Sequence, residues 1–153
     1  MASHTLTVNR EIIAEPAAVW KVITDLDRAP KVFTGIVAVE RVEGDGFDVG
    51  TRWRETRRIA GKEGTEEMWV SAVDEGKSYT VSAKDDGVEY TTLFEVKPSS
   101  VGTTVAVTFG AEATGAGLGQ RMLMSIFGGI GAKITRNALK QDLDDLAAAI
   151  ERR

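Results

Sequence analysis

The stretch TRWRETRRIAGKEGTEEMWV, residues 51–70, consists of two amphipathic segments on either side of the turn sequence GKEG. Apolar and polar residues alternate in both segments, which is typical of β-strands that have one face toward water. We therefore predict a hairpin in which Ala60 lies opposite Thr65. The register of a hairpin decides which side chains share a face. Here the inner face carries Trp53, Glu55, Arg57, Ile59, Met68 and Val70.

The arginines of this hairpin separate into two groups. The outer face carries Arg52, Arg54 and Arg58. We expect solvent around these three side chains and a weak cross-strand pair between Arg58 and Glu67. Glu55 and Arg57 point inward, where a charge needs a partner or a wet cavity. They form either a structural ion pair near the rim of the sheet or a polar feature of a pocket wall.

The turn sequences DEGK, DDG and PSSVG divide the following chain into strands at residues 65–73, 78–85, 88–97 and 103–112. When the hairpin register is carried through these turns, every strand adds mostly apolar residues to the same inner face. These residues are Ala72, Tyr79, Val81, Ala83, Tyr90, Thr92, Phe94, Val96, Val105, Val107, Phe109 and Ala111. The outer face is polar except for Trp69 and Leu93.

Other elements flank this run of strands. Residues 4–13 alternate as a strand, and residues 36–42 form another. Pro16 suits the first turn of a helix whose apolar side carries Val19, Trp20, Ile23 and Leu26. A second short helix or turn is expected at residues 31–34. Residues 118–151 are helical, with an apolar stripe at Leu139, Leu143, Leu146 and Ile150, and the sequence DDLAAAIE is interpreted as a solvated face.

This order of elements predicts one α+β domain over residues 1–153. A curved antiparallel sheet of about seven strands, counting the first, would wrap around the long C-terminal helix. Two short helices would follow the first strand. In the last helix we expect the segment with Met122, Met124, Ile126 and Phe127, and the glycines beside it, to face the interior.

The composition excludes several classes of function. The chain has 153 residues, a net charge of −4 and no cysteine. A negative net charge argues against a general binder of phosphate backbones, and the lack of cysteine excludes disulfides and thiolate chemistry. No segment reaches the roughly 18 apolar residues that a membrane span requires. We expect a cytoplasmic monomer or homodimer with no nucleic-acid partner and no stable membrane insertion.

The sequence also argues against a nucleophilic triad and a metal site. The single histidine, His4, lies at the start of the first strand, and no spacing typical of metal ligands occurs. The sequence GAGLGQ, residues 115–120, lacks the lysine and the βαβ context of a phosphate loop. We expect it to be a flexible gate before the last helix. No metal and no cofactor are therefore expected.

The segments REIIAEPAAVWKVITDLDR, FTGIVAVERVEG, VGTRWRETRR and VSAVDEGKSYTVSA resemble the START-like (SRPBCC) superfamily, in particular its polyketide cyclase/dehydrase-like branch. The resemblance implies a helix-grip fold with a deep hydrophobic cavity between the sheet and the last helix. Members bind lipids, sterols, polyketides, quinones or plant hormones, and some cyclise or dehydrate polyketides. Cyclases of this kind use arginine and tyrosine side chains of the pocket, which suggests such roles for Arg57, Tyr79 and Tyr90.

Three functions remain open. The first is binding of a hydrophobic small molecule by Phe33, Trp53, Met68, Val70, Val81, Thr92, Phe94, Val107, Phe109, Met122, Ile126 and Phe127. The second is a polyketide cyclase or dehydratase whose catalytic group is Arg57 with Glu55, Tyr79 and Tyr90. The third is a regulatory interaction protein with an exposed apolar patch around Trp69 and Leu93.

Overall fold

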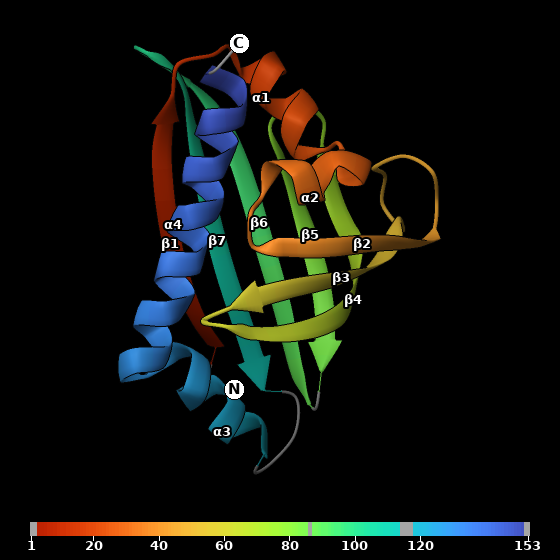
Figure 1. Ribbon diagram of the computed structural model, residues 1–153, viewed down its shortest axis with the longest axis vertical. Coiled ribbons are helices and arrows are strands. Elements are labelled where there is room, and N and C mark those ends of the chain that lie inside the picture. The colour runs from red at the N-terminus through yellow and green to blue at the C-terminus, as the bar shows by residue number, and fades with distance from the viewer. Residues whose placement is uncertain (1–2, 86, 114–117, 152–153) are drawn as a thin grey trace.

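A seven-stranded antiparallel sheet curves around the long C-terminal helix α4 (Gly129–Glu151), as Figure 1 shows for the computed structural model. The structure describes residues 3–85, 87–113 and 118–151. The strands are β1 (Ser3–Ile12), β2 (Ile36–Glu43), β3 (Arg52–Ile59), β4 (Lys62–Asp74), β5 (Ser78–Asp85), β6 (Val88–Ser99) and β7 (Gly102–Ala113). Their order in the sheet is β1-β7-β6-β5-β4-β3-β2. The predicted α+β architecture is confirmed.

The first short helix begins at Pro16 as predicted but ends earlier, and the second lies two residues earlier than the predicted 31–34. Helix α1 (Pro16–Ile23) stops before Leu26, which lies in the 3₁₀ turn η1 (Leu26–Arg28), and α2 spans Ala29–Val32. Thr24 is the C-cap of α1, and its hydroxyl and its N–H both donate to the carbonyl of Trp20. These elements close one end of the sheet's concave face.

The predicted register between β3 and β4 was wrong by four residues, but the predicted faces were right. Ile59 pairs with Lys62, so the turn is the two-residue Ala60-Gly61. Both turn residues have positive φ (51° and 80°), as a two-residue hairpin with the twist of its strands requires. Side chains alternate with a period of two, so a shift of four leaves each on the same face.

The corrected register changes the outer ion pairs. Arg58 pairs with Glu63, which lies opposite it, and not with Glu67 as predicted. Glu67 instead binds Arg52 at 3.0 Å and Arg54 at 3.6 Å. All of these side chains are substantially exposed, so each pair contributes little to stability.

A β-bulge in β4 corrects the prediction for Ala72. Val70 pairs with Val81, but Ala72 pairs with Thr80, so one extra residue enters β4 between these pairs. The bulge exposes Ala72 and turns Val73 toward the core, where it packs against the clusters that contain Tyr79 and Trp53.

The last helical segment is two helices and not the predicted single one. Helix α3 (Leu118–Phe127) ends before Gly128, and α4 begins at Gly129, whose φ of 44° is left-handed. A Cβ on Gly131 would lie 1.8 Å from the carbonyl oxygen of Ser125. The close approach of the two helices therefore requires glycine at this position.

Helix α4 is attached to the sheet by its apolar stripe and by its acidic residues. Leu143, Leu146 and Ile150 are buried against residues of β1 and β7, as the stripe predicts. The acids of DDLAAAIE are not simply solvated. Asp144 binds Arg10, Asp145 accepts two bonds from Thr34, and Glu151 accepts from the N–H of Ile13, all at 2.8–2.9 Å. None of the described helices is long and apolar enough to cross a membrane.

Candidate functional site

A cavity of about 570 Å³ lies between the concave face of the sheet, α1, α2, α3 and α4. Its wall combines apolar side chains from all of these elements with charged side chains, namely Glu55, Arg57, Lys62, Glu63, Glu66, Asp85 and Asp142. The structure brings together most of the predicted site residues on this wall, namely Phe33, Trp53, Glu55, Arg57, Met68, Tyr79, Val81, Tyr90, Thr92, Phe94, Phe109 and Ile126. The cavity has the size and character typical of sites for apolar small molecules.

The other predicted ligand-binding residues lie elsewhere. Val70 is fully buried in a cluster with Leu26 and Trp53, and Val107 is buried in the cluster that holds α4. Phe127 stacks on Phe109 with ring centroids 5.9 Å apart, behind the wall of the cavity. The side chain of Met122 and residues 115–117 of the predicted gate lie outside the described residues, and residues 118–120 of that gate begin α3.

A three-residue charge cluster occupies the centre of the polar wall. Arg57 Nε donates to Glu55 Oε2 at 2.7 Å. Its two terminal nitrogens donate to the two oxygens of Asp142 at 3.1 and 3.0 Å, which is the bidentate geometry that suits a guanidinium. Trp53 Nε1 donates to the second oxygen of Glu55 at 3.2 Å. The ion pair between Glu55 and Arg57 is therefore present, and Asp142 of α4 is its third member. All three residues also line the cavity.

Burial makes this cluster electrostatically strong. Glu55 and Asp142 are buried, while 26% of the Arg57 side chain is exposed, on the cavity side. Burial disfavours the charge of Arg57, but the two carboxylates outweigh it and raise the pKa of the guanidinium. Burial also raises the pKa of Asp142, and the attraction of Arg57 opposes this rise. Arg57 is therefore a permanent cation and not a proton donor.

The tyrosines differ in what they can do chemically. Tyr79 is buried, its hydroxyl donates to the carbonyl of Ile23 at 3.3 Å, and its ring stacks on Phe94 at 4.9 Å. Burial, followed by the charges of Glu55 and Asp142, raises the pKa of Tyr79 well above its usual range. Tyr79 is consequently a poor acid and serves the wall as an aromatic surface. Tyr90 stacks on Phe109 at 5.9 Å.

The sequence interpretation missed several polar residues of the wall, of which Asp142 and Glu66 carry raised pKa values. Asp142 occupies the apolar stripe of α4, between Leu139 and Leu146, and that position was the signal for an inward carboxylate. Glu66 lies two residues before Met68, and strand alternation therefore places it on the inner face. Burial, then the charges of Asp85 and Glu55, raise the pKa of Glu66.

The outer face offers less apolar surface than the interaction hypothesis expects. Trp69 is half-buried, and the guanidinium of Arg52 lies over its ring at 4.7 Å from the centroid. Leu93 is also half-buried. Within the described part of the chain, no three His, Asp or Glu side chains are arranged to hold a metal ion.

Comparisons with known proteins agree with this geometry. The family model "Polyketide cyclase / dehydrase and lipid transport" matches residues 3–151. The structure resembles the ZhuI aromatase/cyclase from Streptomyces sp. R1128, with 15% identity, a TM-score of 0.79, and coverage of 99% of this chain and 96% of that chain. A START superfamily protein from Mycobacterium smegmatis has 16% identity, a TM-score of 0.70, and coverage of 98% and 97%.

Plant proteins share the same arrangement. The ginseng major latex-like protein 151 from Panax ginseng has 15% identity, a TM-score of 0.78, and coverage of 97% of each chain. A comparison with curated protein sequences gives no significant match. At these identities the structural likeness shows the fold, which is the helix-grip fold of the START-like superfamily.

Proposed function

The chain belongs to the polyketide cyclase/dehydrase and lipid transport family, and on that premise we propose that it binds one apolar small molecule inside the cavity. The observation that carries this proposal is the cavity of about 570 Å³, whose largely apolar wall converges on a single guanidinium. Sites of this kind bury most of a ligand in apolar contacts and use a few polar groups to orient it.

Arg57 is the group that would orient the ligand. A guanidinium has five N–H donors, and the bonds to Glu55 and Asp142 use three of them. The side chain also lines the cavity, so the remaining donors are available to a carbonyl or hydroxyl oxygen. Its charge is already balanced by two carboxylates, and this favours a neutral acceptor over an anion.

The primary test is native mass spectrometry of the protein purified from its own host, followed by organic extraction. We expect a co-purifying apolar molecule of defined mass, released when the protein is denatured. A protein that is empty, and that also fails to bind any of a panel of lipids, quinones and polyketides, would contradict the proposal.

Ligand charge gives a sharper prediction. Dodecanol should bind at least about tenfold more tightly than dodecanoate at pH 8, because a carboxylate in the cavity would meet the paired carboxylates of Glu55 and Asp142 and the acid Glu66. Isothermal titration calorimetry measures both affinities. Methyl dodecanoate is the matched control, since it has the same chain without the charge and should bind like the alcohol. Equal affinity for all three would show that the charges of the wall do not select the ligand.

A second candidate function is polyketide cyclisation or dehydration. One observation favours it: Glu66, with its raised pKa, lies on the same wall as Arg57. A carboxyl group with a raised pKa exchanges protons more readily near neutral pH, and Arg57 would polarise a ketone. In this alternative, Glu66→Gln abolishes turnover of a polyketide but leaves its binding intact, whereas a pure binding protein shows no turnover in either form.

A further inference from the structure

Large apolar side chains are exposed where α3 meets α4. Met124 on α3 was predicted to face the interior but is 63% exposed, Ile130 in the first turn of α4 is 79% exposed, and Ile134 follows one turn later. A Cβ on Gly128 would lie 3.2 Å from the terminal methyl of Met124, so this side chain lies directly over the junction. An apolar patch of this kind on a water-facing surface indicates an interaction site.

The same region is basic in a protein that is acidic overall. Residues 118–140 contain four cations, Arg121, Lys133, Arg136 and Lys140, and no Asp or Glu, while the whole chain has a net charge of −4. All four side chains are exposed, and none forms an ion pair with a described residue. The acids of α4 begin only at Asp142, where the helix is fastened to the sheet.

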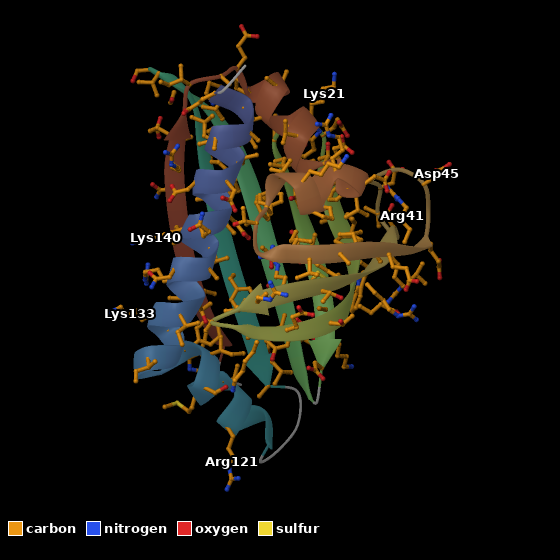
Figure 2. All side chains as sticks on the ribbon, in the orientation of Figure 1. Lys21, Arg41, Asp45, Arg121, Lys133 and Lys140 are labelled. Atoms are coloured by element: carbon orange, nitrogen blue, oxygen red, sulfur yellow. The ribbon has the colours of Figure 1, made fainter. Side chains whose placement is uncertain are left out.

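The orientation of these cations is visible in Figure 2. Arg121 projects from α3 at the end of the molecule, and Lys133 and Lys140 project from the side of α4 that is farther from β2 and β3. The opposite sides of the same helices line the cavity through Ile126, Ala138 and Leu139. The outer surface of the junction and the cavity are therefore separated only by these two helices.

We propose that this surface, which we call the α3–α4 corner and define as Arg121, Met124, Ile130, Lys133, Ile134 and Arg136, docks on a membrane surface that carries anionic lipids. Exposed aliphatic side chains ringed by cations are the combination that inserts at the headgroup boundary and neutralises anionic headgroups. Polyanions such as nucleic acids match only the cations, because they offer no apolar layer to Ile130 and Met124. Docking would place the helices that cover the cavity against the source of an apolar ligand.

Sedimentation with vesicles tests this proposal. The full chain should sediment with vesicles of equal parts phosphatidylglycerol and phosphatidylcholine and remain in the supernatant with pure phosphatidylcholine, and binding should weaken as salt is raised. The double variant Arg121→Gln, Lys133→Gln should lose roughly fivefold in binding for each cation removed. The double variant Met124→Ser, Ile130→Ser should lose binding while retaining its thermal unfolding temperature, because both side chains are exposed.

Matched controls lie at the opposite end of the molecule. Lys21→Gln on α1 removes one cation far from the corner, and Ile13→Ser removes an apolar side chain that is 72% exposed. Ile13 contacts Glu151, about 30 Å along α4 from Ile130. Both controls should bind vesicles like the unmodified chain. No binding to anionic vesicles, or equal effects of the corner and control variants, would overturn the proposal.

The experiment also separates this proposal from the proposed function. Dodecanol binding measured without vesicles reports on the cavity alone, and the corner variants should leave it unchanged. If the chain binds dodecanol but does not bind anionic vesicles, the proposed function stands and the docking proposal is refuted. If the chain binds anionic vesicles but no apolar ligand, the docking proposal stands and the proposed function is refuted.

Discussion

Replacing Arg57 by methionine is expected to destabilise the protein by about 3–5 kcal/mol at pH 7, a large part of the total stability of a domain. The variant leaves Glu55 and Asp142 as uncompensated carboxylates in a buried site. Chemical denaturation measures the loss. The neighbouring Arg58→Met, which removes a more exposed arginine paired with Glu63, should cost less than about 1 kcal/mol.

The loss in Arg57→Met should depend on pH. Burial already raises the pKa of Asp142 above 3.8, and without Arg57 nothing opposes that rise. A carboxyl group whose pKa is higher in the folded state takes up a proton on folding, so its penalty is absent at low pH and grows as pH rises above the unfolded value. The difference from the unmodified protein should therefore be smaller at pH 5 than at pH 7.

A triple variant distinguishes lost charge compensation from lost packing. Glu55→Gln, Arg57→Met, Asp142→Asn removes all three charges and retains an oxygen that can accept the bond from Trp53 Nε1. The triple variant should regain most of the free energy of unfolding that Arg57→Met loses, because replacing every member of a buried ionic cluster by neutral residues costs little. A triple variant as unstable as Arg57→Met would show that packing, and not charge, causes the effect.

Filling the cavity should weaken ligand binding by about 100-fold or more. Thr92 on β6 and Ala138 on α4 line the cavity from opposite sides, and Thr92→Trp with Ala138→Trp places two indole rings in the space of the ligand. Calorimetric titration with dodecanol measures the effect. Overpacking is expected to cost about 1–3 kcal/mol, which thermal unfolding will report.

The matched control places the same side chains on surfaces that do not line the cavity. Thr91 lies on the outer face of β6, and Ala149 on the exposed side of α4. Thr91→Trp with Ala149→Trp should leave dodecanol binding unchanged. If the two double variants bind alike, the ligand does not occupy the cavity.

The fold was largely predictable because alternation and turn chemistry are local properties. The predicted register between β3 and β4 was shifted by four residues, which is a multiple of the two-residue period of a strand. Each side chain of this hairpin therefore stays on its predicted face. The break between α3 and α4 was not predicted, because glycines alone do not define where one helix ends, and the left-handed φ of Gly129 depends on how the two helices meet.

The site was less predictable because it depends on distances between elements. Alternation places Val70 and Val81 equally on the inner face, but Val70 is buried against Leu26 and Trp53, whereas Val81 borders the cavity. Likewise, nothing near Asp142 in the sequence indicates Arg57 as its partner, 85 residues away. The inward direction of Arg57 was predictable, but the ion pair between Arg57 and Asp142 was not.

The order of the strands also has a consequence for how the chain acquires its fold. Strand β1 is made first, yet its neighbour in the sheet is β7, whose pairing joins Ile12 to Thr103 and Ser3 to Glu112. During synthesis the β1 edge must therefore wait until residue 113 has left the ribosome. Pairings so distant in sequence fold slowly and leave an unpaired strand edge open to aggregation in the meantime. Nascent chains that stop short of β7 are the forms most in need of a chaperone.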